Sequence, residues 1–419
     1  MDNLIVAKFG GSSLADAAQV RKVIDIVKGD PRRKVVVVSA PGKRFAGDSK
    51  MTDLLIANQV MLARERFAQI ATALGIDVDT SDLCQMSGDL LVSSGEYYMG
   101  KILAKALDYT FVGASLLVRF KTGGILDMPA TKVSCEQFRD LAKRGIVVPG
   151  FYGALPDGSV KIFSRGGSDI TGSILAAILK ASIYENWTDV SGVLMADPGV
   201  VENPRRIKTM TYREMRELAY AGAHVLHDEA VYPVRKAEIP INVRNTNDPA
   251  DAGTWIVADE QLEESTSTAI TGIAGRNNFS VIALEKAGMN AEVGFVWKLL
   301  DVLKKHCVRF EHMPSSIDSL SLVVDERELE GKLSFLEQDI RAACRPDLLE
   351  IERGLALVCV VGQSMAHKPG VLAKLAGALA KAGVNIHMID QGSSEVSIIV
   401  GVENNDYEKA VRAIYKAFA

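Results

Sequence analysis

The sequence lacks the short motifs that mark the commonest nucleotide-binding and hydrolytic sites. No two glycines are separated by a single residue, which excludes the GxGxxG fingerprint of dinucleotide-binding folds. No Gly-Lys pair is followed by serine or threonine, which excludes a P-loop, and neither HExxH nor GxSxG occurs. Any phosphate-binding loop in this chain must therefore be built in another way.

Cysteines, long apolar runs and excess charge are also scarce. The five cysteines are scattered without a CxxC pair, so we expect reduced thiols in an intracellular protein and no disulfide framework. No apolar run approaches the roughly 18 residues that a membrane span needs, and no signal peptide is visible. The net charge of −4 gives no indication of nucleic-acid binding. We therefore expect a soluble cytoplasmic protein without a membrane or nucleic-acid partner.

The composition and length are those of a multidomain globular protein. The 419 residues are 48% apolar and 24% charged, which is enough for two or three domains with their own cores. Up to residue 265, apolar runs are interspersed with helical patterns, as expected for strands buried on both faces. This order predicts an α/β domain over 1–265, with an open, mostly parallel sheet covered by helices on both faces. The strand-like runs are 34–40, 144–151, 161–167, 181–189 and 239–245.

The remaining residues contain a repeat that begins after the polar segment 259–268. Each unit has the order strand, helix, strand, strand, helix, and each has a double serine and an acidic residue between its middle strands. The strands expected in the first unit are 280–286, 308–316 and 318–326. We predict two ferredoxin-like βαββαβ domains over 266–346 and 347–419, and leave open whether the second exchanges a strand with the first. The turn residues are Ser315, Ser316 and Asp318 in the first unit, and Ser393, Ser394 and Glu395 in the second.

The stretch VAKFGGSS, residues 6–13, is the first candidate for a phosphate site. Lys8 ends a strand-like run and offers a point charge for a phosphoryl group. Gly10 and Gly11 allow backbone N–H groups to approach phosphate oxygens without interference from a Cβ. A helix follows, and its positive end would point at the same place. On local grounds, an ordinary glycine turn with a solvated lysine explains the stretch equally well.

A second glycine-rich loop, SRGGSDITG over 164–172, also follows a strand and opens a helix. Arg165 is suited to a bidentate grip on a carboxylate, and Asp169 could orient a lysine. The alternative is a simple strand-to-helix turn in which Ser168 or Asp169 caps the helix. Two such loops, each after a strand, favour phosphate transfer over two unrelated turns.

Two further stretches place carboxylates at the ends of elements. In WTDVSGVLMADP, Thr188 and Asp189 end a strand and Asp197 precedes a proline, so they could hydrogen-bond adenine or ribose. Asx-type turns explain them equally well. In SSGEYYMG, Glu96 could receive the ammonium of an amino-acid substrate, although a solvated glutamate at a helix start is the simpler local explanation.

These motifs in this order (KFGGSS, SGE, SRGGSD, WTDVSG with a later DP, and a tandem ferredoxin-like tail) resemble the aspartokinases over nearly the whole chain. The resemblance implies the amino-acid kinase fold and two ACT domains that bind an amino acid as feedback effector. It implies that a monofunctional enzyme of lysine, threonine and methionine biosynthesis converts ATP and L-aspartate to ADP and 4-phospho-L-aspartate, with Mg²⁺ carried by the nucleotide. A kinase for another acceptor (glutamate, acetylglutamate or UMP) and a non-catalytic amino-acid sensor stay open as alternatives.

The resemblance also implies roles for individual residues. Lys8 would stabilise charge on the γ-phosphoryl group, Asp169 would organise that lysine, and Arg165 would grip the α-carboxylate of aspartate. No protein ligand for a metal is expected, and we interpret His224 and His227, three apart without a third partner, as helix-face histidines. Residues expected to line the rest of the aspartate site are Ser39, Thr52, Glu96, Phe151 and Ser168. Residues expected along the nucleotide are Gly10, Gly11, Ser12, Thr188, Asp189, Leu194, Asp197 and His224.

The chain departs from the family pattern around the nucleotide. His224 occupies a position where similar enzymes often have a lysine, Leu194 stands at an adenine-side aromatic position, and Gly199 replaces an arginine. The loop between Ser39 and Thr52, after the predicted strand 34–40, is longer than expected, adds Lys43, Arg44 and Lys50, and could be a lid over substrate. We hypothesise that Lys43 or Lys50 supplies the lost cation, and an unchanged KM for ATP in Lys43→Ala and Lys50→Ala would refute this.

The tail implies regulation by an amino acid. In similar enzymes the effector binds at the loop and helix start of the first repeat, against the middle strands of a partner chain. The acidic residues there favour lysine over threonine, although two acids on a solvated sheet edge are a serious alternative. Pairing of ACT sheet edges predicts a homodimer or homotetramer. The corresponding residues are Met289, Gly294 and Phe295, with Glu311, Ser316 and Asp318 opposite.

Overall fold

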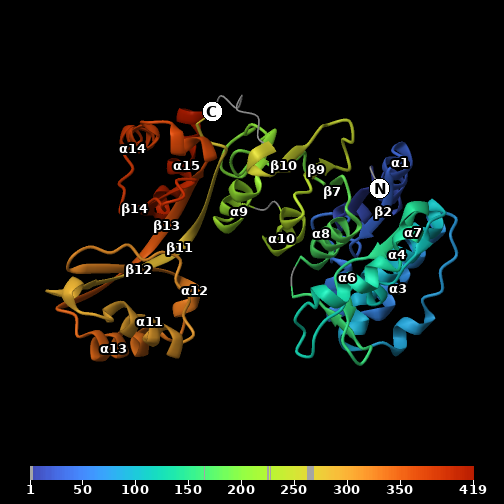
Figure 1. Cartoon of the computed structure of the whole chain (residues 1–419), viewed down its shortest axis with the longest axis horizontal. Helices are drawn as coiled ribbons and strands as arrows, with labels where there is room; N and C mark the ends of the chain where they lie inside the picture. Colours follow the sequence, from blue (N-terminus) through green and yellow to red (C-terminus); the bar gives the residue numbers. More distant parts are fainter. Residues whose placement is uncertain (1–2, 165, 224–225, 227, 262–268) are drawn as a thin grey trace. The chain divides into compact units, whose positions relative to one another are not determined.

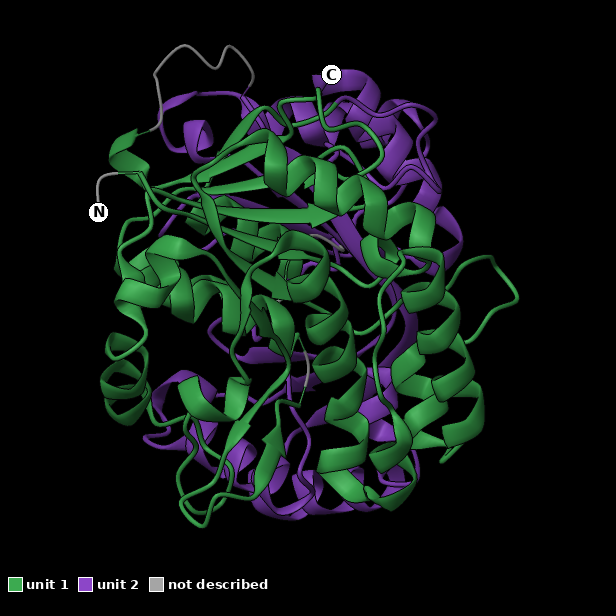
Figure 2. Cartoon of the chain, turned by 90° about the vertical axis from the view of Figure 1, so that its right-hand side faces the viewer, with its two compact units in different colours: residues 1–193, 206–219, 224–265 green, residues 194–205, 220–223, 266–419 purple. Residues whose placement is uncertain are grey.

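The computed structural model describes residues 3–164, 166–223, 226, 228–261 and 269–419, and the chain divides into two compact units. The first unit contains residues 1–193, 206–219 and 224–265, and the second contains 194–205, 220–223 and 266–419 (Figure 2). The chain thus passes into the second unit twice before the polar segment at which we expect the domain boundary. Both repeats of the tail lie within the second unit.

The first unit is built on an eight-stranded sheet whose order differs from the order along the chain. Neighbouring strands run parallel except for β9 and β10. The predicted open, mostly parallel α/β sheet is therefore confirmed. From one edge to the other, the strands are β3 (Thr110–Phe111), β4 (Ile146–Pro149), β2 (Arg33–Val38), β1 (Ile5–Phe9), β7 (Ile183–Thr188), β9 (Ile241–Asn245), β10 (Thr254–Val257) and β8 (Thr209–Thr211).

One predicted strand, 161–167, does not belong to this sheet. β6 (Val160–Ile162) pairs antiparallel with β5 (Tyr152–Ala154) in a separate two-stranded sheet. β6 ends at Ile162, and the predicted run cannot reach residue 167 as a strand, because Gly166 takes a left-handed conformation, with a φ of 59°, and opens the helix α8 (Gly167–Leu179).

Helices cover both faces of the eight-stranded sheet (Figure 1). α1 (Ala17–Gly29), α3 (Val60–Ala73) and α4 (Gly88–Leu107) share one apolar core with residues of β1, among them Ala7 and Phe9. α8 packs on β1 and β7 and is covered by α10 (Asp228–Lys236). Because side chains alternate along a strand, Lys8 points away from the core that contains Ala7 and Phe9, toward α8.

The remaining elements before residue 265 are short. None of the helices that the structure describes is long and apolar enough to cross a membrane. The short elements are η1 (Ser12–Leu14), α2 (Met51–Ile56), η2 (Ser81–Gln85), α5 (Ala114–Leu117), α6 (Met128–Glu136), α7 (Arg139–Arg144), α9 (Tyr212–Tyr220) and η3 (Asp259–Gln261).

The second unit is built on a five-stranded antiparallel sheet, which confirms the predicted ferredoxin-like character of the tail. β11 and β13 are each 14 residues long and pair along most of their length, so a strand of the first repeat is joined to a strand of the second. The strand order is β12 (Ser319–Asp325), β11 (Gly272–Glu285), β13 (Leu348–Val361), β15 (Ser397–Glu403) and β14 (Met388–Asp390). The helices are η4 (Met289–Ala291), α11 (Phe295–Lys305), α12 (Glu326–Leu329), α13 (Leu333–Cys344), η5 (Gln363–His367), α14 (Val371–Lys381), η6 (Asn404–Asp406) and α15 (Tyr407–Phe418).

One strand prediction in the tail is wrong and another is too short. The expected strand over 308–316 is reduced to isolated bridges on either side of Pro314, which has no N–H to continue a ladder. β11 begins at Gly272, well before the predicted start at Ser280. The ladder between β11 and β13 shifts register near Asn278, which has a φ of 70°. Asparagine with this φ is typical of a turn, so the sequence there does not indicate a continuous strand.

Candidate active site

Lys8 stands at the centre of the candidate site, at the C-terminal end of β1. Its side chain is buried, and its Nζ lies 2.6 Å from Oδ1 of Asp169. Asp169 belongs to the first turn of α8, so the ion pair joins a strand end to a helix start. The structure thus brings together the two residues that we expect to act together.

The glycines after β1 keep the backbone close to this ion pair. The Gly10 N–H donates to the Trp187 carbonyl oxygen at 2.9 Å, which continues the pairing of β1 with β7. A Cβ on Gly10 would stand 3.7 Å from the Lys8 Nζ. A Cβ on Gly11 would stand 2.8 Å from the carbonyl oxygen of Ala40, too close for any side chain. Glycine is therefore required at Gly11 for close backbone approach, and at Gly10 it leaves the space beside the lysine open.

The start of α8 packs against the end of β4. A Cβ on Gly150 would stand 2.6 Å from the Ser168 Cα, and one on Gly167 would stand 2.7 Å from the Phe151 Cα. Phe151 has a φ of 77°, which is rare for a bulky residue and must be held in place by the surrounding packing. Strained backbone of this kind clusters at functional sites. Phe151 and Ser168, both predicted site residues, therefore lie on either side of one tight contact between β4 and α8.

Glu96, in α4, is buried near the same strand ends. α4 approaches the end of β2 closely at Gly95, where a Cβ would stand 2.7 Å from the Ala40 Cβ. Glu96 is 4% exposed, and its Oε2 has no hydrogen-bond partner among the described residues. Burial raises the pKa of Glu96 to about 8, against the opposing effect of a backbone hydrogen bond from Ala40. An incoming cation would relieve this unfavourable arrangement.

Ser39 and Thr52 lie at the same end of the sheet as Glu96. Ser39 directly follows β2, and its N–H donates to the Phe9 carbonyl oxygen at 3.1 Å. Thr52 is half-buried in the first turn of α2. The preceding residue, Met51, packs against α4, because its Cγ would stand 3.5 Å from a Cβ on Gly95. Both predicted residues are therefore at the end of the sheet where the α4 carboxyl is buried.

Thr188 and Asp189 mark the end of β7, the neighbour of β1. The Thr188 hydroxyl donates to Asp189 Oδ1 at 3.1 Å, and the Thr246 N–H donates to the Thr188 carbonyl oxygen at 2.8 Å. Ser12 begins η1 just after the glycines. The C-terminal ends of β1, β2, β4 and β7 thus bring together residues from distant parts of the chain. Open α/β sheets bind their ligands at this edge.

Four predicted site residues are not placed in this group. Leu194 and Asp197 belong to the second unit. Asp197 Oδ1 accepts the Gly199 N–H at 2.8 Å, which is the Asx-type turn that local sequence favours equally. Arg165 and His224 lie outside the described residues, as does the second histidine of the possible metal pair.

Asn186 is a residue of this region that the sequence analysis missed. It lies in β7 beside Lys8 of β1, and its Nδ2 donates to Asp169 Oδ1 at 2.7 Å. The signal was a polar residue inside the predicted strand 181–189. The register that pairs Asn186 with Lys8 could not be read from one sequence.

Arg66, in α3, was also missed, and it anchors the loop between β2 and α2. Its guanidinium is buried and donates to the carbonyl oxygens of Ser49 at 2.8 Å, of Ala15 at 3.2 Å and of Gly42. It also lies 3.4 Å from the Asp48 carboxylate. The loop in which we expect Lys43 or Lys50 to supply a cation is thus tied to the helix layer, while both lysines are exposed.

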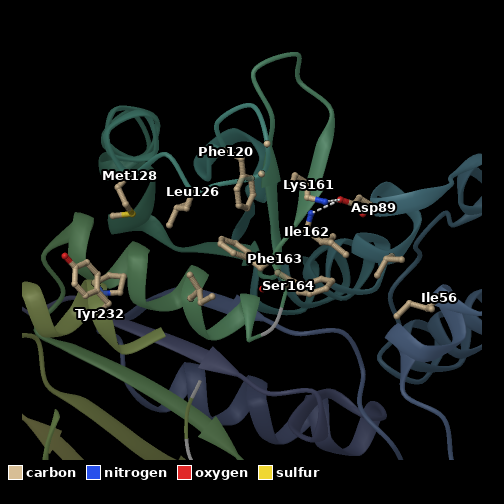
Figure 3. A pocket seen from close by; sticks show the side chains of 16 residues that line it. Ile56, Asp89, Phe120, Leu126, Met128, Lys161, Ile162, Phe163, Ser164 and Tyr232 are labelled. Atoms are coloured by element: carbon tan, nitrogen blue, oxygen red, sulfur yellow. Dashed lines mark hydrogen bonds and ion pairs between the residues drawn. The ribbon is translucent and has the colours of Figure 1, made fainter. Parts of the chain in front are cut away.

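A cavity of about 680 Å³ opens beside the start of α8 (Figure 3). Asp89 and Lys161 face it as an ion pair of 2.9 Å, drawn as a dashed line in Figure 3. The rest of the lining is mostly apolar and aromatic, which suits the entry of a small molecule. Phe151, a predicted site residue, lines the cavity. Ser164 and Ile170, each next to a predicted site residue in the sequence, line it as well.

The predicted effector residues lie in the second unit, in two groups. Met289 and Phe295 are buried in the core of the first repeat, and Gly294 precedes α11 with a left-handed φ of 82°. Ser316 and Asp318 lie in the turn before β12, where Asp318 Oδ1 accepts the Gly288 N–H at 2.8 Å. This hydrogen bond ties the turn to the loop that leads into α11.

Glu311 does not stand free at this edge. Its Oε2 lies 3.2 Å from Nη2 of Arg276, so the carboxylate expected to receive an effector ammonium has a cationic neighbour within its own chain.

No group of three His, Cys, Asp or Glu side chains within the described part of the chain is arranged to hold a metal ion.

The candidate site in the first unit therefore has two chemically distinct halves. Around Lys8, a buried cation and bare glycine backbone suit the phosphate oxygens of a nucleotide. Around Glu96, a buried carboxyl with a free oxygen suits a cationic group. Both halves lie at the same end of the sheet.

Comparison with known proteins gives a consistent result. The amino acid kinase family matches residues 3–245, and the ACT domain matches residues 358–418. Aspartokinase 3 of Bacillus subtilis is 40% identical to this chain, over 99% of this chain and 98% of its own length.

Solved structures agree. The aspartate kinase of Clostridium acetobutylicum, described as an allosteric enzyme, matches with a TM-score of 0.94 and 47% identity, over 99% of this chain and 100% of its own. Aspartokinase III of Escherichia coli in complex with aspartate and ADP matches with a TM-score of 0.78 and 26% identity, over 99% of each chain. In complex with lysine and aspartate, the same protein matches with a TM-score of 0.73.

Proposed function

Because the chain belongs to the amino acid kinase family, and within it to the aspartokinases, we propose that it phosphorylates L-aspartate with ATP. The products are ADP and 4-phospho-L-aspartate, and Mg²⁺ accompanies the nucleotide as part of the substrate. The observation that carries the proposal is the buried Lys8 ammonium, held by Asp169 next to bare glycine backbone. The complex of E. coli aspartokinase III with aspartate and ADP supports aspartate and an adenine nucleotide as the ligands here.

In this proposal, Lys8 and the glycine loop form the phosphoryl half of the site. Charge redistributes over the phosphoryl oxygens during transfer, so a fixed cation and fixed N–H groups stabilise the transition state. Asp169 keeps Lys8 in place, and the backbone of Gly10, Gly11 and Ser12 faces the phosphates. Further contacts along the nucleotide are proposed for Thr188, Asp189, Leu194, Asp197 and His224.

Glu96 and its neighbours form the acceptor half. The α-ammonium of aspartate would satisfy the free Glu96 oxygen and lower the pKa of the carboxyl. Arg165 is proposed to bind the α-carboxylate. The side-chain carboxylate of aspartate is already ionised at neutral pH, so the reaction needs no general base. The other walls of this half are proposed to be Ser39, Thr52, Phe151 and Ser168.

We further propose that the second unit binds an amino acid that inhibits the kinase, as suits the first step of lysine, threonine and methionine biosynthesis. Lysine is the first choice, because E. coli aspartokinase III has been solved with lysine and because Glu311 and Asp318 are acidic. Threonine is the second choice. Binding of an ammonium at Glu311 requires Arg276 to share or release that carboxylate. The remaining effector contacts are proposed to be Met289, Gly294, Phe295 and Ser316, between chains of a homodimer or homotetramer.

Hydroxylamine trapping of the acyl phosphate tests the proposed reaction. The protein is incubated with MgATP and one acceptor at a time (aspartate, glutamate, acetylglutamate or UMP), and ADP release is followed in parallel. We expect aspartyl hydroxamate from aspartate alone, in an amount that lysine reduces.

Other outcomes separate the alternatives. Turnover of a different acceptor would contradict the proposed substrate. Folded protein that turns over none of them would favour the amino-acid sensor. Aspartate turnover that neither lysine nor threonine reduces would overturn the account of the effector and leave the kinase.

A further inference from the structure

Asn186 is a buried polar residue with no role in the proposed reaction. In the parallel ladder between β1 and β7, Asn186 is paired with Lys8, and strand alternation turns both side chains toward α8. Its neighbour Trp187 packs in the core on the opposite face of the sheet. Asn186 is 3% exposed, so its amide must find partners inside the protein.

The partner of Asn186 is the same oxygen that holds Lys8. Asn186 Nδ2 donates to Asp169 Oδ1 at 2.7 Å, and Lys8 Nζ lies 2.6 Å from that oxygen. One carboxylate oxygen therefore receives donors from two adjacent strands. Together these donors fix the position and the rotation of the carboxylate.

A second residue of β7 holds the backbone beneath this carboxylate. The Tyr184 hydroxyl donates to the Asp169 carbonyl oxygen at 3.2 Å. A Cβ on Gly172 would stand 2.7 Å from Cε2 of Tyr184, so the helix and the strand are in close contact here. Tyr184 and Asn186 lie two residues apart and therefore on the same face of β7, so they tie the first turn of α8 to the strand at two points.

We propose that Asn186 is a positioning residue for phosphoryl transfer, acting on Lys8 through Asp169; this inference rests on the proposed function. The Lys8 ammonium has three N–H donors, and charge on the phosphoryl oxygens draws these donors away from Asp169. A partly buried carboxylate that loses its donor is unfavourable, and this cost opposes the movement of Lys8. Asn186 continues to donate a hydrogen bond to Asp169 during phosphoryl transfer. Its amide is uncharged, so it does not compete with the phosphates for the Lys8 ammonium.

An uncharged amide suits this task better than related side chains. Aspartate at this position would place a second carboxylate beside Asp169 and hold the ammonium away from the phosphates. Leucine would fill the space but remove one of the two side-chain donors that Asp169 has among the described residues. Both changes should therefore slow the chemical step more than they weaken nucleotide binding.

Asn242 provides a matched control in the next strand. It is 2% exposed, it lies in β9, and its Nδ2 donates to the Ala252 carbonyl oxygen at 3.0 Å. It pairs with Glu185, so it points to the opposite face from Asn186. Asn242→Leu thus removes a buried amide hydrogen bond from the same sheet without touching the ion pair.

The test compares the steady-state kinetics and Tm of the parent, Asn186→Leu, Asn186→Asp and Asn242→Leu, with MgATP and aspartate varied separately. We expect Asn186→Leu to lower kcat about 30-fold while the KM for ATP stays within about threefold. Asn186→Asp should lower kcat about 100-fold, because it adds a like charge. Asn242→Leu should lower Tm but leave kcat within about twofold.

An Asn186→Leu enzyme with parental kcat overturns the inference, and so does an equal loss of kcat in Asn242→Leu. If Asn186→Leu does not fold, the isosteric Asn186→Asp decides, and a parental kcat in that variant overturns the inference. A parent that does not phosphorylate aspartate overturns the proposed function and this inference together. An active parent with unaffected Asn186 variants overturns this inference alone.

Discussion

The Lys8 ammonium and the Asp169 carboxylate lie 2.6 Å apart, so the protein itself supplies the counter-charge for the central cation of the site. A net-neutral pair allows Lys8 to be buried before any nucleotide arrives. The phosphates then compete with Asp169 for the donors of the ammonium. This competition makes the pair the natural place to test how the site works.

Replacing Asp169 by asparagine should slow catalysis without weakening nucleotide binding. Asp169→Asn keeps the shape of the side chain but removes its charge, so Lys8 loses its fixed position. We expect kcat to fall about 100-fold, while the Kd for MgATP stays the same or decreases because an anionic competitor is gone. Steady-state kinetics and nucleotide titration measure the two quantities. A parental kcat in Asp169→Asn would contradict the assigned role.

The KM for aspartate should fall as pH rises toward 8. In the empty site the Glu96 carboxyl is protonated below a pKa of about 8, and it attracts the substrate ammonium only when ionised. We expect the KM to fall about tenfold between about pH 6.5 and about pH 8.5. In Glu96→Gln the KM should be high and nearly independent of pH. A parental KM that does not change over this range would exclude Glu96 as the ammonium receptor.

The same carboxyl should destabilise the protein at alkaline pH. Glu96 binds its proton more tightly in the folded protein, with a pKa of about 8, than in the unfolded chain, where the ordinary value is 4.5. Stability is therefore lost as pH rises from about 4.5 to about 8. Near pH 8.5, the free energy of unfolding of Glu96→Gln should be higher than that of the parent. Near pH 5, the difference between the two free energies should be smaller. Urea unfolding at both pH values measures this, and a margin that does not grow with pH would be the contrary result.

The two glycines after β1 should respond differently to alanine. A Cβ on Gly11 would stand 2.8 Å from a backbone carbonyl oxygen, so Gly11→Ala should lower Tm and impair folding. A Cβ on Gly10 meets only ordinary contacts, 3.4 Å from the Trp187 carbonyl oxygen and 3.7 Å from Lys8 Nζ. Gly10→Ala should therefore fold normally but lower kcat about tenfold by crowding the lysine. Thermal melting and kinetics separate the two effects. The same Tm and the same kcat in Gly10→Ala and Gly11→Ala would contradict the different roles assigned to the two glycines.

Local motifs predicted the part of the site that lies close to strand ends. Lys8 and Asp169 lie far apart in the sequence, yet each stands beside a glycine-rich strand-to-helix turn. Turns of this kind meet at one edge of a parallel sheet, so their proximity could be expected. The role of Asn186 could not, because it depends on the register between β1 and β7.

Other parts of the prediction depend on features that a short local pattern does not reveal. Leu194 and Asp197 follow Asp189 closely in sequence, but the chain enters the second unit after Val193, and their role along the nucleotide stays a proposal. The strand predicted over 308–316 is interrupted at Pro314, which has no N–H for a ladder. The predicted start of β11 is too late, because the strand continues through an irregularity near Asn278.

The central claim is that Lys8 is the cation that stabilises phosphoryl transfer to aspartate. Lys8→Met retains most of the apolar stem and removes the ammonium, so the comparison of its kcat with that of the parent tests the claim most directly. We predict a loss of about 1000-fold in kcat, with a cooperative thermal transition that shows the variant is folded. A folded Lys8→Met enzyme whose kcat lies within about tenfold of the parent would contradict the account.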